Sequence, residues 1–512
     1  MSFKRNVDCK QDQKLISYHD ALSRISEVAN SQAASWQFNA RQCSYRSTGG
    51  ELELTKASLV RTDASFVSLG DALGKKNIRK LIAPHSTPQD DTSAMDGFAV
   101  CSTETLAASD NKPLMLRVVD TIAAGDEYRS KIGTNISSFQ HQNVCAEIMT
   151  GACFPETSLP HLDAVVKIED VAMVDWSEDG ATVSRYIQLK SPVKPFQHRR
   201  PAGSDFHKDD LIVDEGHIIR PKHIAALASL GFDRIEVEDD DTGTPEPCPT
   251  STRTPKLRIG VLPTGSELEE LGTKHRNDQM KQIIPDSNGP YLTSTIRSHY
   301  PWADVKYLGV AVDDEESLTR QLAEATSGDF DIVVSSGGVS MGRFDLVRHV
   351  VETRLKGEII FHGVAIRPGA PVLFARFGKE AAGDRQVAFF GAPGNPLAAA
   401  VALQFFVFPY ISNLTAASIE LPLRRGHESG YCFQDESEYC AQDCTTKTPV
   451  RRKPKDMTVF WLAAQQSENA VEIIDDQASY KLSGLLKADC WVVLPAGQNE
   501  VHTGDRLKTW PL

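Results

Sequence analysis

The stretch SSGGVSMGRFD, residues 335–345, decides how the middle of this 512-residue chain is interpreted. It follows a strand-like run at 331–334 and opens with small residues, which are Ser335, Ser336, Gly337, Gly338 and Ser340. Glycine loops at the ends of strands typically bind anions through backbone N–H groups. Asp345 closes the stretch, at the start of an expected helix. The pattern therefore predicts an anion-binding loop with a carboxylate beside it.

Around this stretch the sequence alternates between strand and helix patterns. Strands are expected at 256–262, 304–312, 331–334 and 386–390, and helices at 291–299, 315–326, 346–355 and from 397 onward. Such alternation predicts a parallel sheet with helices on both faces. The remaining regions show a helical pattern at 14–28, short strands from 66 to 237, a helix at 220–231 and short strands again at 416–512.

An acidic segment rich in proline, threonine and serine, residues 239–255, is the strongest boundary signal in the chain. It separates the β-rich first half from the alternating α/β region. We therefore expect β-rich N-terminal domains over 1–238, an α/β domain over 256–415 and a small β domain over 416–512.

Composition narrows the class of protein. The formal net charge is −13, which disfavours a general nucleic-acid or acidic-membrane binder, since both need a basic surface. The N-terminus lacks the apolar core of a signal peptide. The most apolar run, 397–411, is interrupted by Gln404 and Pro409 and is too short to span a bilayer, so we expect a buried helix. The ten cysteines are scattered without a zinc-binding pattern, which favours free thiols and a cytoplasmic protein.

Acidic residues follow several of the expected strands. Glu267 lies in PTGSE, Asp286 in IIPDSNGPYL and Asp345 after the glycine loop. Ligands of open α/β sheets bind beyond the carboxyl ends of the strands, so these acids are predicted to converge there. Carboxylates beside a bound phosphate need a cation between them, and Mg²⁺ takes both kinds of oxygen. The alternative is that each acid only caps a helix.

Motifs along the chain resemble a known family. In order they are TSAMDGFAV, IMTGA, DAVVKIED, RRPAGSD, PTGSELEE, DSNGPYL, SSGGVSMGRFD, RPGAP and GAPGNP. The order of these motifs and the residues within them resemble the molybdopterin molybdotransferase family, of the MoeA type and the gephyrin E domain. The resemblance implies an elongated multidomain chain, with β-rich N-terminal domains I and II, a molybdopterin-binding-like three-layer α/β domain and a C-terminal β domain.

The resemblance also implies an activity and partners. Family members insert molybdenum from molybdate into adenylylated molybdopterin, release AMP and require Mg²⁺. They act as homodimers with composite sites, and a separate molybdopterin adenylyltransferase protein is the expected upstream partner. No nucleic acid or membrane is expected to take part.

Site residues carry over position by position. The catalytic set is Asp96, Thr150, Glu267, Asp286 and Asp345, of which Glu267, Asp286 and Asp345 are the expected metal ligands. The expected substrate-binding set is Ser336, Gly337, Gly338, Ser340, Arg367, Pro393, Asn395 and Pro396. Asn395 stands where a helix N-cap belongs and Pro396 at the first helical position.

Four positions depart from the family pattern, and they are Thr92, Ser266, Gly363 and Ala370. The departures at Gly363 and Ala370 remove positive charge that relatives often carry. An alternative function is therefore a catalytically weakened member that acts as a scaffold or ligand-binding protein. A third interpretation is a nucleotide or pyrophosphate hydrolase built on the same crevice.

Overall fold

The computed structural model describes residues 15–33, 64–125, 143–155, 162–176, 184–238, 257–273, 283–327, 329–340, 346–378, 386–418, 442–446, 450–451, 456–467 and 469–512. The chain forms two compact units. The first contains Ile82–Asp210 and Ser266–Pro285, and the second contains Lys14–Leu81, Leu211–Gly265 and Asp286–Leu512. The boundary predicted at 239–255 and the predicted site residue Asp345 lie outside the described residues.

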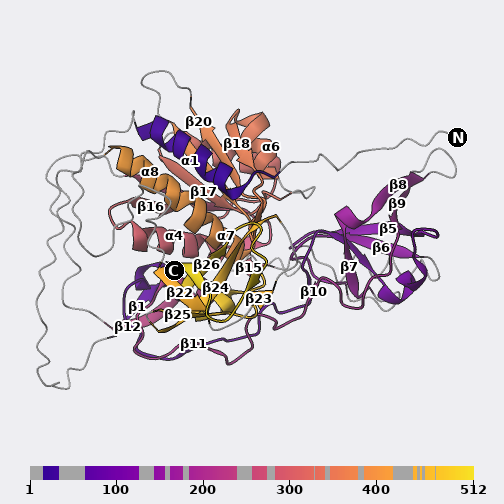
Figure 1. Ribbon diagram of the computed structural model, residues 1–512, viewed down its shortest axis with the longest axis horizontal. Coiled ribbons are helices and arrows are strands. Elements are labelled where there is room, and N and C mark those ends of the chain that lie inside the picture. Colours follow the sequence, from indigo (N-terminus) through magenta and orange to yellow (C-terminus); the bar gives the residue numbers. More distant parts are fainter. Residues whose placement is uncertain are drawn as a thin grey trace, which may run out of the picture. The chain divides into compact units, whose positions relative to one another are not determined.

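A six-stranded sheet in the order β7-β4-β6-β5-β9-β8 forms the body of the first unit (Figure 1). Its strands are β4 (Gly97–Val100), β5 (Leu114–Ile122), β6 (Val144–Ile148), β7 (Ala164–Lys167), β8 (Ala172–Trp176) and β9 (Ser184–Leu189). Neighbours are antiparallel except for the parallel pair β5 and β6. Side chains alternate along β4, so Phe98 and Val100 lie in one apolar cluster and Ala99 in another. Both faces of this sheet are therefore packed.

Short elements complete the first unit. They are β3 (Thr92–Ser93), the 3-10 helices η3 (Ser102–Ala107) and η5 (Ile168–Asp170), β10 (Arg199–Arg200), β14 (Leu268–Glu269) and β15 (Ile284–Pro285). β10 pairs antiparallel with β3, and β14 pairs parallel with β15. β2 (Leu81–Ile82) lies where the chain passes from one unit to the other.

The second unit is built on a six-stranded sheet in the order β16-β13-β17-β21-β20-β18. Its strands are β13 (Arg258–Pro263), β16 (Asp304–Tyr307), β17 (Ile332–Ser336), β18 (Glu358–His362), β20 (Leu373–Phe377) and β21 (Val387–Ala392). The first four strands of that order run parallel, as expected, and β20 and β18 extend the sheet antiparallel. The parallel arrangement of the four predicted strands is confirmed, but the sequence pattern missed β18 and β20, which pair antiparallel because β18 returns to β20 without the helical crossover that parallel strands need.

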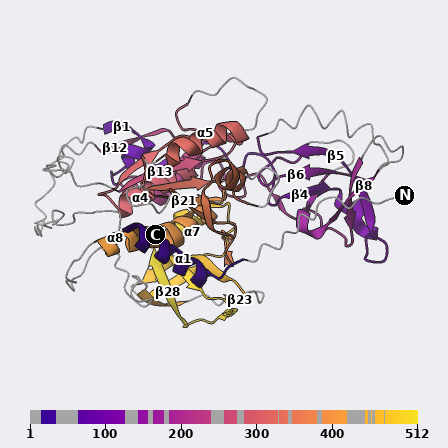
Figure 2. The ribbon, with the colours of Figure 1, turned by 90° about the horizontal axis from the view of Figure 1, so that it is seen from above.

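Helices cover both faces of this sheet, and Figure 2 shows β13 and β21 between α5 (Glu315–Thr326) and α7 (Pro396–Ala402). Side chains of α5 and α6 (Leu346–His349) pack on the sheet in one core cluster, which includes Leu318, Leu322, Val333, Val347 and Phe389. On the opposite face, Phe390 stacks on Phe374 with ring centroids 4.5 Å apart, and Tyr410 contacts both rings. The predicted three-layer α/β domain is confirmed.

The predicted helices of this region are present with shifted ends. α4 (Asn288–His299) begins before the predicted start at 291, and α6 continues into the π-helical segment η6 (Val350–Arg354). α7 continues through the π-helical segment η7 (Leu403–Val407) into α8 (Phe408–Ser418). The run Pro396–Thr415 is long and apolar enough to cross a membrane, but 94% of its apolar window is buried inside the structure. That burial agrees with the core helix predicted from the sequence, whereas the prediction that it is too short to span a bilayer is wrong, because the helix extends beyond the apolar run at 397–411.

The N-terminal helix α1 (Tyr18–Ala33) lies beside α8 (Figure 1). Asn413 Nδ2 donates to Ser26 Oγ at 2.9 Å, and Gln32 Nε2 donates to the Gln386 carbonyl at 2.9 Å. The second unit also contains a two-stranded sheet, in which β1 (Ala64–Ser68) pairs antiparallel with β12 (Arg234–Glu238). Nearby elements are the 3-10 helix η2 (Leu69–Ala72), β11 (Leu211–Val213) and α3 (Pro221–Ser229).

The last part of the chain forms a closed β structure. Its elements are β22 (Gln442–Thr446), β23 (Val450–Arg451), β24 (Thr458–Ser467), β25 (Ala470–Ile473), α9 (Leu482–Lys487), β26 (Cys490–Leu494), β27 (Glu500–Val501) and β28 (Arg506–Pro511). The pairings run β24-β25-β22-β28-β26 and return to β24, so the ring has no free edge. β19 (Ile366–Arg367) pairs with β24 from outside this ring. The predicted C-terminal β domain is confirmed.

Helix α3 begins as its sequence predicts, with Pro221 at its first position and Gly231 just past its end. His223 Nδ1 accepts a hydrogen bond from the Arg220 amide at 3.1 Å, which satisfies an N–H group at the helix start. Burial, aided by the charges of Lys222 and Arg220, lowers the pKa of His223 to about 4. The native protein therefore keeps this imidazole neutral at pH values where an unfolded chain protonates it.

The difference in the pKa of His223 between the native and the unfolded chain predicts that the protein is less stable in acid. As pH falls from about 6.5 to about 4 the unfolded chain gains a proton that the native state does not, so His223 should remove up to about 3 kcal/mol of stability. The variant His223→Gln keeps an acceptor for the Arg220 amide but does not titrate. We expect its urea unfolding midpoint to fall less than that of the parent between pH 7 and pH 4.5. Equal losses in both proteins would show that His223 is not the group responsible.

Candidate active site

The glycine loop predicted from the sequence leaves the carboxyl end of β17 and lies between its two parallel neighbours. The Thr264 amide, just beyond β13, donates to the Ser336 carbonyl at 2.7 Å. The Gly337 amide donates to the carbonyl of Ala392, the last residue of β21, at 2.9 Å. The loop therefore sits at the strand ends of the sheet, where open α/β sheets bind ligands.

Glycine is required at two positions of this loop. Gly337 has φ +96° and Gly338 has φ +64°, which are backbone conformations that side chains disfavour. A Cβ atom at Gly337 would lie 2.2 Å from the Thr264 carbonyl oxygen, and one at Gly338 would lie 2.7 Å from a methyl of Val347. The backbone of the loop is therefore packed directly against its neighbours.

Three buried hydroxyls at these strand ends have no hydrogen-bond partner among the described residues, and they belong to Thr264, Ser335 and Ser336. Thr264 is 3% exposed, and its Oγ1 lies 2.9 Å from the position that a Cβ at Gly337 would take. Leaving a buried polar group without a partner costs about 1–3 kcal/mol, so these hydroxyls are candidates to hydrogen-bond a ligand or water. Side chains alternate along β17, so one ligand is not expected to satisfy both serines.

A second loop, after β21, meets the first. Gly394 faces Gly337 closely enough that a Cβ at Gly394 would lie 3.6 Å from the Gly337 Cα atom. Asn288, at the start of α4, donates from Nδ2 to the Gly394 carbonyl at 2.8 Å. Asn395 is the N-cap of α7 and Pro396 its first residue, as predicted. These contacts gather three sheet-end loops around the glycines.

Asp286 lies beside these loops and is 1% exposed. Its Oδ1 accepts from the Gly289 amide at 3.0 Å and its Oδ2 accepts from the Tyr307 hydroxyl at 2.9 Å. The carboxylate therefore does help to cap α4, as the alternative interpretation proposed. Both of its oxygens thus accept hydrogen bonds from residues of the same sheet edge, which fixes the orientation of the carboxylate.

Asp96 and Thr150 come together in the first unit, although 54 residues separate them. Asp96 Oδ1 accepts from the Thr150 amide at 2.8 Å and from the Thr150 hydroxyl at 2.9 Å. The residue after Asp96 must be glycine, because a Cβ atom at Gly97 would lie 2.0 Å from the Val166 carbonyl oxygen. No described residue donates to Asp96 Oδ2, so one carboxylate oxygen is held and the other can accept a hydrogen bond from a ligand.

Glu267 also belongs to the first unit. Gly125, with φ +84°, approaches it so closely that a Cβ at Gly125 would lie 3.1 Å from the Glu267 Cα atom. Asp286 belongs to the second unit and Asp345 lies outside the described residues, so the convergence of the three acids stays a prediction. The described residues contain no group of three histidine, cysteine or acidic side chains able to hold a metal.

The other predicted binding residues lie in the second unit. Ser340 is exposed, Pro393 is buried and Arg367 is exposed on β19. Gly363, one of the departures from the family pattern, has φ +94°, and a Cβ there would lie 2.8 Å from a methyl of Leu15. A long basic side chain at this position would therefore be strained in this chain.

Sequence reasoning missed Thr264 and Asn288 as site residues. The signal for Thr264 was its position two residues after the predicted strand 256–262, in the same loop as Glu267. Asn288 lies in the quoted segment DSNGPYL, two residues after Asp286. In both cases the contact that gives the residue its place joins loops far apart in the sequence.

Comparisons with known proteins cover most of the chain. Family models match residues 16–231 (MoeA N-terminal region, domain I and II), 260–413 (probable molybdopterin binding domain) and 445–512 (MoeA C-terminal region, domain IV). The crystal structure of the molybdopterin biosynthesis MoeA protein from Pyrococcus horikosii is 23% identical and covers 97% of this chain and 99% of its own, with a TM-score of 0.41.

Curated relatives match over nearly their whole length. The molybdopterin molybdenumtransferase of Synechococcus elongatus is 28% identical over 455 residues, which are 88% of this chain and 94% of that protein. The protein of the same name from Haemophilus influenzae is 26% identical over 450 residues, with the same two coverages. With its N-terminal, molybdopterin-binding and C-terminal regions all matched in order, the chain belongs to the MoeA family.

Proposed function

We propose that this protein is a molybdopterin molybdenumtransferase, which inserts molybdenum from molybdate into adenylylated molybdopterin and releases AMP. The observation that carries the proposal is the loop at Gly337 and Gly338, beside the unpartnered buried hydroxyl of Thr264. Such a loop suits phosphate oxygens, which accept from hydroxyl and backbone N–H donors. Curated relatives that carry this enzyme name match 88% of the chain.

We propose Mg²⁺ as the metal that accompanies the phosphate groups. The donors fit, since Mg²⁺ prefers oxygen ligands and usually binds one or two carboxylates together with phosphates and water. Asp286, Glu267 and Asp345 are the residues that would hold it, as the family resemblance implies. When bound, Mg²⁺ supplies positive charge that stabilises the departing AMP.

Asp96 and Thr150 act through hydrogen bonds. The two bonds from Thr150 fix the position of the Asp96 carboxylate, and its second oxygen can accept a proton or a hydrogen bond. We propose that this pair orders molybdate or a water molecule during insertion. A carboxylate that is already oriented needs no rearrangement when the ligand binds.

We also propose a homodimer with composite sites, in which the Asp96 cluster of one subunit completes the glycine loop of its partner. A molybdopterin adenylyltransferase protein would supply the adenylylated substrate. The cytoplasm is the proposed compartment, because the described cysteines are free thiols, as expected where disulfides are kept reduced. These cysteines are Cys101, Cys145, Cys153, Cys444 and Cys490.

The purified protein, given adenylylated molybdopterin and Mg²⁺, tests the function. We expect AMP to appear together with molybdenum cofactor, and only when molybdate is present. The same gene should restore molybdoenzyme activity to cells that lack molybdenum insertion. AMP release without molybdate would instead indicate a hydrolase. Binding without AMP release would indicate a scaffold, which the curated relatives do not favour.

Thr264 allows a test in which stability and binding move in opposite directions. Thr264→Val removes a buried hydroxyl without a partner, so the ligand-free protein should gain about 1 kcal/mol of stability. Affinity for ADP, a stable probe for the adenylyl anhydride, should fall about tenfold, because a hydrogen bond to a charged phosphate is lost. Urea unfolding and calorimetric titration measure the two effects.

Thr293 on α4 provides the matched control. It is 5% exposed, and its hydroxyl also has no partner among the described residues. Thr293→Val should raise stability by a similar amount and leave ADP affinity unchanged, because Thr293 lies more than one helical turn beyond Asn288, the α4 residue that contacts the sheet-end loops. If both variants bind ADP as the parent does, Thr264 does not face the ligand.

A further inference from the structure

The glycine loop has a side-chain contact from a residue that the motifs did not single out. His362, the last residue of β18, is 7% exposed. Its Nε2 lies 2.7 Å from the carbonyl oxygen of Val339, the residue that follows the two glycines. His362 pairs with Leu373 in the sheet, so its backbone is held while its ring reaches the loop.

The contacts of the ring define its tautomer. A carbonyl oxygen only accepts, so Nε2 must carry a hydrogen and donate to Val339. Nδ1 lies 3.4 Å from Arg348 Nη1, and a guanidinium only donates, so Nδ1 accepts. Arg348 also forms an ion pair with Glu352, in which Arg348 Nε lies 3.5 Å from Glu352 Oε2. Burial first, and then the Arg348 charge, lowers the pKa of His362, which agrees with a neutral ring.

The loop is attached to the rest of the domain at consecutive residues. Gly337 is held through its amide by Ala392, and the Gly338 carbonyl accepts from the Val347 amide at 3.1 Å. His362 then holds Val339. Two adjacent glycines have wide conformational freedom, so each attachment that is removed lets the loop leave its ligand-binding conformation more often.

We propose that His362 is a positioning residue, whose Nε2–H group holds the carbonyl of Val339 and thereby keeps the 337–340 loop in the conformation that binds phosphate. That the loop binds phosphate rests on the proposed function. That His362 holds the loop does not depend on it. His362 itself does not touch substrate in this account. It acts by lowering the conformational freedom of the backbone that does.

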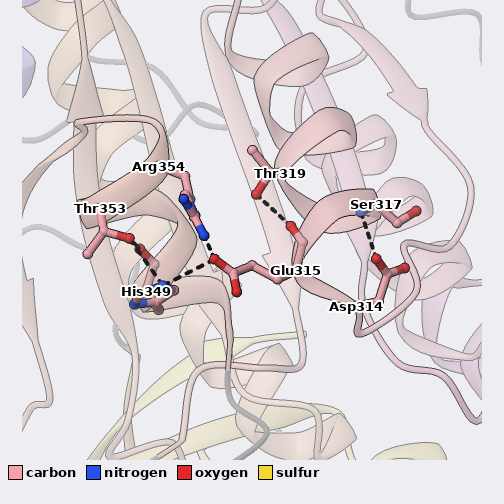
Figure 3. Close-up of polar contacts among 7 residues, drawn as sticks. All are labelled: Asp314, Glu315, Ser317, Thr319, His349, Thr353 and Arg354. Atoms are coloured by element: carbon pink, nitrogen blue, oxygen red, sulfur yellow. Dashed lines mark hydrogen bonds and ion pairs between the residues drawn. The ribbon is translucent and has the colours of Figure 1, made fainter.

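Two substitutions separate hydrogen bonding from packing. His362→Met has similar bulk and no donor, whereas the amide nitrogen of His362→Gln can reach the place of Nε2 and donate to Val339. His349 is the matched control. It is exposed, lies on the neighbouring helix α6 and contacts Glu315 and Thr353 instead of the loop (Figure 3). His349→Gln should therefore behave as the parent does.

The first readout needs no ligand. Hydrogen–deuterium exchange of the peptide that covers 336–340 should be faster by about tenfold in His362→Met, near the parent rate in His362→Gln and unchanged in His349→Gln. The second readout is ADP titration, in which His362→Met should bind about five- to tenfold more weakly while kcat for AMP release stays within about twofold of the parent. His362→Gln should recover most of the affinity.

Several results would overturn the proposal. Parent-like exchange in His362→Met would show that the contact does not hold the loop, and equal losses in the Met and Gln variants would show that only ring shape matters. If His362→Met does not fold, ¹⁵N-histidine NMR of the parent decides, because an Nδ1–H tautomer excludes donation to Val339. If the parent neither binds ADP nor releases AMP, the proposed function fails, while the exchange experiment still decides the role of His362.

Discussion

Gly337→Ala is expected to abolish phosphate binding by the glycine loop and to reduce AMP release more than about 100-fold. The new Cβ would lie 2.2 Å from the Thr264 carbonyl oxygen, inside any permitted contact, and φ is +96° at this residue. Backbone strain of about 1–3 kcal/mol adds to that clash. Relief requires Thr264 to move, and Thr264 is part of the same site. ADP titration and the AMP release assay measure the loss.

Gly394→Ala is the control for this experiment. A Cβ at Gly394 would meet only the Gly337 Cα atom within 4 Å, at 3.6 Å, which is an ordinary contact distance. Affinity and turnover should therefore stay within about threefold of the parent, since such a contact needs no rearrangement. Circular dichroism and urea unfolding should show that both variants fold. Parent-like ADP binding by Gly337→Ala would place the ligand somewhere other than this loop.

Mixed dimers of Asp96→Ala and Asp286→Asn subunits are expected to recover activity that neither variant shows alone. Each substitution should lower turnover about 100-fold or more, because each removes a charge from the proposed reacting site. Asparagine at 286 can still accept from the Gly289 amide, and the Tyr307 hydroxyl can reverse its direction, so α4 keeps its cap. If sites are composite, one of the two sites in a mixed dimer carries both native acids.

With random mixing, half of the dimers are mixed, so recovery should reach about a quarter of parent activity for a symmetric dimer. Mixing Asp96→Ala with Thr150→Val is the control, because these two residues are hydrogen-bonded within one unit and would belong to the same half of the proposed composite site. That mixture should recover far less activity. No recovery in the first mixture, with mixed dimers shown by mass spectrometry, would falsify composite sites and favour a complete site in each subunit.

The sequence alone determined the features that depend on local chemistry. A pair of glycines after a strand-like run predicted the loop at Gly337 and Gly338, because only glycine adopts these backbone angles readily. Asn395 and Pro396 marked the start of α7, and Pro221 and Gly231 marked the two ends of α3. Each signal acts over a few residues, so no knowledge of the rest of the fold was needed.

The tertiary structure decided which distant residues meet. The bond between Asp96 and Thr150 and the contact of His362 with Val339 join segments that are 54 and 23 residues apart along the chain. The antiparallel pairing of β18 with β20 likewise depends on how the chain turns back on itself. The unpartnered hydroxyl of Thr264 likewise appears only when burial is known. Closing such contacts depends on the packing of whole layers, and one residue's type and neighbours in sequence carry little information about that packing.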